Sequence, residues 1–139
     1  MLIGPDQESE QWVRGVAEAV QAPYVILEKI RRGDRDVEIS IPNMEAYTGY
    51  TPVLVDDIIA TARTLMAIVG RLRQTGMKAP ICIGVHAVFT GNAYQELRAS
   101  GVQSVVTCNT IEHVSNAIDM HERVAKETQD LARHYPGSF

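Results

Sequence analysis

The chain has 139 residues, of which 45% are hydrophobic and 22% charged, and this size and composition indicate one globular domain over residues 1–139. The net charge of −4 argues against nucleic acid as a partner, and no apolar run reaches the length of a membrane span. Cys82 and Cys108 lie in apolar, strand-like runs, so we expect buried free thiols and a reducing, cytoplasmic location.

Strands and helices alternate along the chain. Hydrophobic patterns predict strands at residues 1–4, 24–27, 37–41, 53–55, 81–85 and 104–107. Helical spacing predicts helices at about 7–20, 61–74, 93–100 and 117–134, and a charged, hairpin-like loop at 28–38. The alternation is typical of an α/β fold, in which a mainly parallel sheet is flanked by helices.

The segment 53–64 (VLVDDIIATART) is the most informative part of the sequence. An apolar strand leads into two adjacent carboxylates, Asp56 and Asp57, and a loop with Thr61 and Thr64 then opens a helix. Ligands of open α/β sheets bind at the carboxyl ends of strands, and a helix N-terminus offers N–H groups to phosphate. Adjacent carboxylates suit sugar hydroxyls or Mg²⁺. The segment predicts a sugar-phosphate site, and an Asp that simply caps the helix is the structural alternative.

This segment resembles the phosphoribosyl-diphosphate (PRPP) binding motif of type I phosphoribosyltransferase folds. The resemblance implies that Asp56 and Asp57 hold ribose hydroxyls, with Mg²⁺ nearby, and that residues 61–64 cradle the 5-phosphate. Within that loop, Ala62 and Arg63 stand where the family often has glycines, which allow close backbone approach to phosphate. Arg63 either clashes with the phosphate or adds a bidentate contact to it.

The segment 28–38 (EKIRRGDRDVE) is densely charged. Lys29 and Arg31 are two residues apart, so in an extended chain they point the same way. Two cations on such an arm could close over phosphates and neutralise the charge that develops in phosphoryl transfer. The structural alternative is a solvated surface loop.

The order of these motifs resembles the C-terminal half of the ribose-phosphate pyrophosphokinase (PRPP synthetase) family. The resemblance runs from Met1 to about Asn116, and it rests on GPD at 4–6, KIRR at 29–32, VEIS at 37–40, the segment 53–64 and GVHAVF at 84–89. It implies transfer of diphosphate from ATP to ribose 5-phosphate, which makes PRPP, with Mg²⁺. It also implies a missing N-terminal half, with which the abrupt start at Met1 agrees.

The same resemblance assigns roles residue by residue. Lys29 and Arg31 would be catalytic and stabilise the transferring phosphates, and Asp6 would lie near the ribose. His86 matches a histidine at a strand end, and a purely structural role explains it equally well. Ala60 stands where many members of the family carry an acid.

Two other functions stay open. The chain could be a free-standing phosphoribosyltransferase that uses PRPP, although it lacks an obvious hood segment for a base. It could also be a catalytically silent domain that binds sugar phosphate and regulates a partner subunit. If the chain is the C-terminal half of a PRPP synthetase, which is the preferred hypothesis, the isolated chain is expected to be inactive and to bind ATP weakly. It also forms a homo-oligomer, because the surface that packs on the missing half is exposed.

Overall fold

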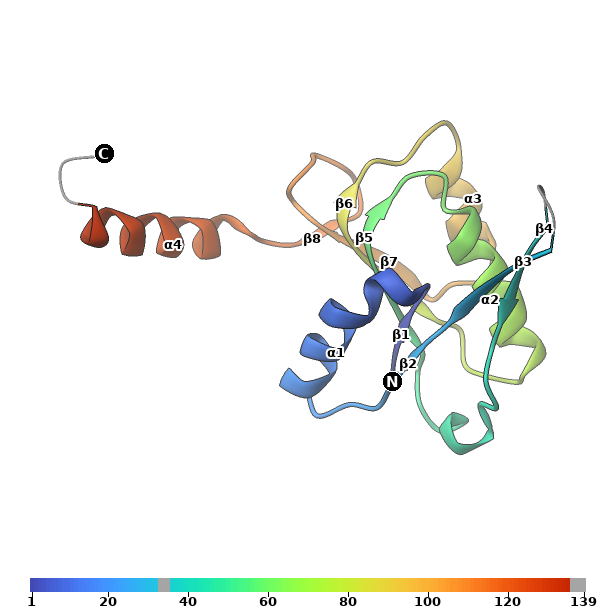
Figure 1. Ribbon diagram of the computed structural model, residues 1–139. Helices are drawn as coiled ribbons and strands as arrows, with labels where there is room; N and C mark the ends of the chain where they lie inside the picture. Colours follow the sequence, from blue (N-terminus) through green and yellow to red (C-terminus); the bar gives the residue numbers. More distant parts are fainter. Residues whose placement is uncertain (33–35, 136–139) are drawn as a thin grey trace.

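A six-stranded sheet forms the centre of the computed structural model (Figure 1). The structure describes residues 1–32 and 36–135, except for the side chains of 29–32 and 36–38. The strand order is β2-β1-β5-β6-β7-β8, and every pairing is parallel. The strands are β1 (Leu2–Gly4), β2 (Tyr24–Ile26), β5 (Val53–Ile59), β6 (Ile81–Ala87), β7 (Ser104–Cys108) and β8 (Asn116–Ile118). This arrangement confirms the predicted α/β fold.

Helices cover both faces of the sheet (Figure 1). The helices α2 (Arg63–Gln74) and α3 (Ala93–Ala99) lie on one face, and α1 (Glu10–Ala19) lies on the other. The apolar side chains of α2 recur at i, i+3, i+4 and i+7, which places them in a single stripe against the sheet. These fully buried residues are Leu65, Ile68, Val69 and Leu72. Burial of each such side chain contributes about 1.5–3 kcal/mol, so this stripe fixes α2 beside β5.

The charged segment forms a second, two-stranded sheet. Strands β3 (Glu28–Arg32) and β4 (Asp36–Ser40) pair antiparallel, with Lys29 opposite Ile39 and Arg31 opposite Val37. The prediction of a loop over 28–32 was therefore wrong: this segment pairs along its whole length with β4, although four of its five residues are charged. Ile39 is buried in the main core, which holds this hairpin against the domain. A short 3₁₀ helix, η2 (Glu45–Tyr47), follows it.

The C-terminal region also departs from the prediction. Instead of one helix over 117–134, the chain adds the edge strand β8 and then forms α4 (His121–His134). The Asn116 side chain donates hydrogen bonds to the Cys108 carbonyl at 2.8 Å and to Thr107 Oγ1 at 2.9 Å, which pins this strand to β7. The helix α4 then projects from the rest of the molecule (Figure 1) and buries none of its residues. Within the described ranges, no helix is long and apolar enough to cross a membrane.

Candidate functional site

Strand β5 carries the predicted acid pair inside the sheet. It continues to Ile59, well beyond the predicted end at Val55, because Asp56 pairs with Gly84 and Ile58 with His86. Asp56 is half-buried and Asp57 is exposed. Neighbouring backbone N–H groups hold both carboxylates in place. The Asp57 N–H donates to Asp56 Oδ1 at 3.1 Å, and the Ile58 N–H donates to Asp57 Oδ1 at 2.8 Å.

A pocket of about 130 Å³ lies where β5 gives way to α2. Its lining is Asp56, Ile58, Ile59, Ala60, Thr61, Ala62, Arg63, Thr64 and Leu65. The structure thus gathers Asp56 with the whole predicted phosphate loop, while Asp57 does not line this pocket. Thr61 and Arg63 are exposed, and Thr64 is half-buried at the start of the helix. Hydroxyls and an arginine beside one carboxylate form a polar hollow that suits a small phosphorylated polyol.

Ala62 makes the turn from the loop into α2. Its φ of 56° lies in the left-handed region, its methyl group is buried, and it provides no side-chain cap for the helix. The first N–H groups of an α-helix have no partner within the helix, and here they meet the pocket at the positive end of the dipole. The residue type that the family favours at this point, glycine, is the one that adopts this φ without strain.

Replacing Ala62 with glycine is expected to leave stability nearly unchanged. A left-handed backbone costs a non-glycine residue about 1–2 kcal/mol, and relief of this strain offsets the lost methyl burial and the added chain entropy. Ala17 is the matched control, because it is equally buried but helical in α1. Urea denaturation should show a loss of about 1 kcal/mol or more for Ala17→Gly alone. Equal losses for the two variants would contradict the strain at Ala62.

Asp6 lies at the same edge of the sheet as the acid pair. It follows β1, which pairs with β5, and it begins the short 3₁₀ helix η1 (Gln7–Ser9), which contacts β5. Its Oδ1 accepts a hydrogen bond from the Ser9 N–H at 3.2 Å, so the carboxylate caps this turn. Asp6 does not line the pocket, and its predicted contact with ribose stays a prediction.

Strand β6, beside the acid pair, contains a glycine that allows close packing and a cysteine with a buried thiol. A Cβ on Gly84 would stand 2.6 Å from Ile59 Cδ1, so only glycine lets this pocket-lining side chain pack across β6. Burial, and then the charge of Asp56, raises the pKa of the Cys82 thiol to about 12. Cys82 is therefore protonated at neutral pH and has no role as a nucleophile.

His86 lies on β6 and is held by a side chain that sequence patterns did not single out. Its Nδ1 lies 2.9 Å from Thr110 Oγ1, which itself donates to the Val85 carbonyl at 2.9 Å. The single hydroxyl proton of Thr110 is used in that bond, so His86 Nδ1 carries a proton and donates to Oγ1. Only the fold brings these two positions together, and no motif predicts the pair.

The predicted catalytic arm is placed only as backbone. Lys29 and Arg31 occupy alternate positions of β3, and their side chains lie outside the described part of the structure. Strand β4 ends beside the C-terminal half of α2, where Ile39 and Ser40 share a hollow with Arg71. The proposed action of both cations on phosphate stays a prediction.

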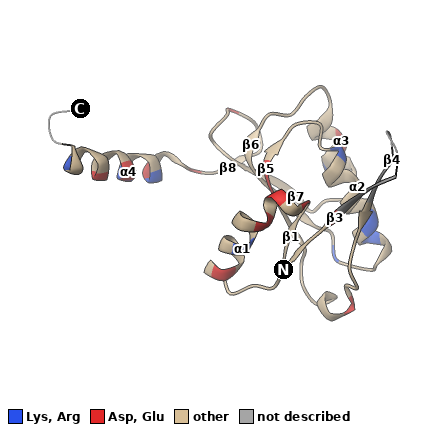
Figure 2. Cartoon of the chain, viewed as in Figure 1, with Lys and Arg blue, Asp and Glu red and all other residues tan. Residues whose placement is uncertain are grey.

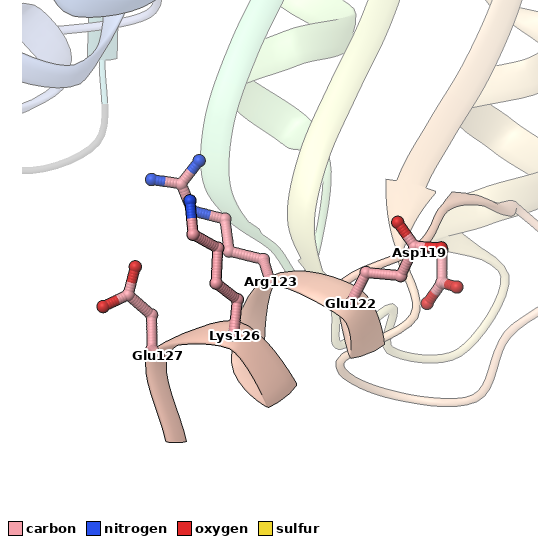
Figure 3. A pocket seen from close by; sticks show the side chains of 5 residues that line it. All are labelled: Asp119, Glu122, Arg123, Lys126 and Glu127. Carbon is pink, nitrogen blue, oxygen red and sulfur yellow. The ribbon is translucent and has the colours of Figure 1, made fainter. Parts of the chain in front are cut away.

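A larger hollow lies away from the β5–α2 pocket. Its lining consists of charged side chains of α4 and of Asp119, two residues before that helix (Figure 3), namely Asp119, Glu122, Arg123, Lys126 and Glu127. No core element contributes to it, and its charges are mixed in sign. We therefore place the candidate site at the β5–α2 pocket, where Asp56 and the predicted phosphate loop converge.

Comparisons with known proteins place the chain in a family. The chain belongs to the phosphoribosyl transferase domain family, whose model matches residues 1–123. It is also similar to several ribose-phosphate pyrophosphokinases. It is 35% identical over 113 residues to the one from Sulfurisphaera tokodaii, a match that covers 79% of this chain and 38% of the relative. It is 31% identical over 132 residues to the one from Methanopyrus kandleri, covering 95% of this chain and 45% of the relative.

A solved structure has the same fold. The crystal structure of phosphoribosylpyrophosphate synthetase from Mycobacterium smegmatis superposes with a TM-score of 0.76 at 21% identity, covering 96% of this chain and 45% of that chain. The chain thus spans less than half the length of each of these relatives.

Proposed function

We propose that this chain is the C-terminal, ribose-5-phosphate-binding half of a ribose-phosphate diphosphokinase. The complete enzyme would transfer the β,γ-diphosphoryl group of ATP to the anomeric oxygen of ribose 5-phosphate, releasing AMP and forming PRPP. The observation that carries the proposal is the convergence of Asp56 with residues 61–64 in one pocket at a strand end. Similarity to ribose-phosphate pyrophosphokinases over most of the chain supports the choice of reaction.

Each part of the proposed site has a distinct task. The N–H groups at the start of α2, with Thr61 and Thr64, bind the 5-phosphate, and Arg63 adds a charge-assisted contact. Asp56 and Asp57 accept hydrogen bonds from the ribose hydroxyls and so orient the anomeric oxygen toward the β-phosphorus of ATP. Lys29 and Arg31 stabilise the negative charge that develops on the phosphoryl oxygens.

The acid pair also fits a magnesium ion that is shared with substrate. The described residues contain no group of three or more His, Cys, Asp and Glu side chains that could enclose a metal by themselves. Mg²⁺ in phosphoryl-transfer sites is commonly held by one or two carboxylates together with substrate phosphates and waters. Asp56 and Asp57 would therefore hold it. When bound, the ion neutralises phosphate charge.

The two alternative functions predict different substrates. A free-standing phosphoribosyltransferase would consume PRPP with a free base, and a silent regulatory domain would bind sugar phosphate without turnover. Ala60 and Arg63, which stand where the family often has an acid and a glycine, are the residues that favour the silent domain. The deciding assay compares ATP plus ribose 5-phosphate with PRPP plus free bases, using this chain joined to an N-terminal half. AMP release in the first mixture alone supports the synthetase; turnover only in the second, or in neither, rejects it.

The isolated 139-residue chain is expected to show no measurable PRPP synthesis. Its described pocket gathers only the residues predicted for ribose phosphate, and by the family resemblance most of the ATP site comes from the N-terminal half and a neighbouring subunit. Coupled detection of AMP release is the measurement, with a complete ribose-phosphate pyrophosphokinase as positive control. Sustained AMP release by the purified chain would show that one half suffices.

A further inference from the structure

We propose that His113 is a positioning residue for the β5–α2 pocket and acts only in its neutral form, so that protonation of His113 weakens the hold of the pocket on a phosphate-like anion. The inference rests on the proposed function, because it requires that residues 61–64 bind an anion. Three features carry it: a hydrogen-bond chain that ends on His113, a ring contact from His113 to Phe89, and a backbone bond from Thr90 to the pocket.

A chain of hydrogen bonds fixes the protonation state of His113. The Asn116 amide donates to Thr107 Oγ1 at 2.9 Å, and Thr107 Oγ1 lies 2.8 Å from Ser115 Oγ. Ser115 Oγ lies 2.7 Å from His113 Nδ1, and the Ser115 N–H donates to the same nitrogen at 3.2 Å. A backbone N–H is always a donor, so His113 Nδ1 must present its lone pair. The ring is therefore the neutral tautomer with its proton on Nε2.

A proton on Nδ1 breaks this arrangement. Thr107 is fully buried and Ser115 is 5% exposed, so little water reaches these groups. The Ser115 hydroxyl can turn and accept the new proton, but the Ser115 N–H cannot turn and loses its acceptor. The faces of Phe89 and Tyr94 attract an imidazolium, yet this attraction does not restore the lost bond. Protonation of His113 is therefore expected to displace the ring and open the loop 109–115.

The ring of His113 forms one side of an aromatic cluster. Its centroid lies 4.7 Å from that of Phe89, at an angle of 31° between the planes, and 4.9 Å from that of Tyr94 in α3, at 83°. Phe89 and Tyr94 meet edge to face at 5.3 Å. Both residues also pack against the main core. The His113 ring thus closes one side of Phe89, and its displacement loosens the segment that carries Phe89.

The residue after Phe89 joins this cluster to the pocket. The Thr90 N–H donates to the Ala60 carbonyl at 3.1 Å, and Ala60 lines the pocket directly before the phosphate loop 61–64. The loop that follows β5 and the loop that follows β6 therefore lie side by side (Figure 1). His113 does not line the pocket, so it acts on Ala60 through Phe89 and Thr90.

Few charges surround His113. The segments 88–92, β7 and β8 contain no Lys, Arg, Asp or Glu (Figure 2). The titratable groups on the elements that contact His113 or its loop are Tyr94, Glu96 and Arg98 of α3, Cys108 of β7, Glu112, and His86, which meets the loop through Thr110. Glu96, Arg98 and Glu112 are exposed. His86 already donates from Nδ1, so a proton on its Nε2 leaves its bond to Thr110 intact.

The test measures sulfate binding to the full chain by backbone amide shifts, below and above the range in which histidines usually titrate, at about pH 5 and about pH 7.5. Sulfate keeps its charge between these values, whereas a phosphate ester gains a proton near pH 6. The chain itself becomes more positive at low pH, which alone strengthens sulfate binding. We expect the opposite at residues 61–64, an affinity about fivefold or more weaker at the lower pH.

His113→Asn is the deciding variant. Asparagine Oδ1 can accept from the Ser115 N–H but takes up no proton in this range, so sulfate affinity should stay level or rise as pH falls. The matched control, His134→Asn, removes an exposed histidine of α4 and should lose affinity at low pH as the unchanged chain does. In the unchanged chain without sulfate, the protection of the Thr90 amide against hydrogen exchange should also fall when His113 is protonated.

Three results would overturn the inference and leave the proposed site standing. The first is sulfate binding at residues 61–64 that is as tight or tighter at the lower pH. The second is a loss of affinity that persists in His113→Asn. The third, which needs no variant, is unchanged protection of Thr90 while the ring shifts of His113 report its protonation. If residues 61–64 respond to sulfate at neither pH, the proposed phosphate site itself is rejected, and the inference with it.

Discussion

Replacing Lys29 with alanine in the complete two-domain enzyme is expected to lower kcat about a hundredfold or more, with a much smaller change in KM. A cation that meets negative charge only as the diphosphoryl group transfers stabilises the transition state more than the bound substrates. Loss of such a contact therefore appears in turnover. Steady-state kinetics with ATP and ribose 5-phosphate provides the measurement.

Arg32→Ala is the matched control for this variant. Arg32 carries the same charge in the same strand, but it belongs to the other set of alternate positions in β3. Its replacement should change kcat far less than that of Lys29. If Lys29→Ala keeps normal turnover, or if both variants lose activity equally, the segment acts only through its overall charge and not as a catalytic arm.

Replacing Asp57 with asparagine is expected to weaken binding of ribose 5-phosphate by about 5- to 150-fold. Removal of one partner of a charged hydrogen bond costs about 1–3 kcal/mol. Because Asp57 is exposed and an asparagine Oδ1 can still accept from the Ile58 N–H, the fold should survive. Calorimetric titration with and without Mg²⁺ measures the effect, which should be larger when magnesium is present.

The control for this variant is Glu18→Gln, which removes an exposed carboxylate from α1, away from the pocket. Its affinity for ribose 5-phosphate should equal that of the unchanged chain. An Asp57→Asn variant that binds as tightly as this control would remove Asp57 from the ribose site and leave Asp56 as the pocket's carboxylate.

Periodicity predicted the elements that bury a clear apolar stripe. The helix from Arg63 was recognised because its apolar residues recur with a period of 3.6, and the strands around Val55 and Ile83 because they are short, continuous apolar runs. The edge strand β8 was missed, since its pairing depends on Asn116 and its bond to the Cys108 carbonyl, which leave no periodic pattern. Likewise β3 was taken for a loop, because four of the five residues 28–32 are charged and leave no apolar alternation.

The candidate site was predictable where its residues are adjacent in sequence. Asp56 and the loop 61–64 meet in one pocket because a strand end and the following helix start are neighbours in any α/β unit. The left-handed turn at Ala62 and the bond between His86 and Thr110 were not predictable, since backbone φ and contacts across 24 positions arise only in the folded chain. The arm at Lys29 remains a prediction from resemblance.

The most direct test of the central proposal is a titration of the 139-residue chain with ribose 5-phosphate, followed by backbone amide chemical shifts. Inorganic phosphate and ribose alone serve as comparison ligands. The account predicts that the amides of residues 61–64 shift with ribose 5-phosphate and with phosphate, and that those of Asp56 and Asp57 respond only when the sugar is present. Shifts elsewhere in the chain while the amides of 61–64 stay still would contradict a sugar-phosphate site at the β5–α2 pocket.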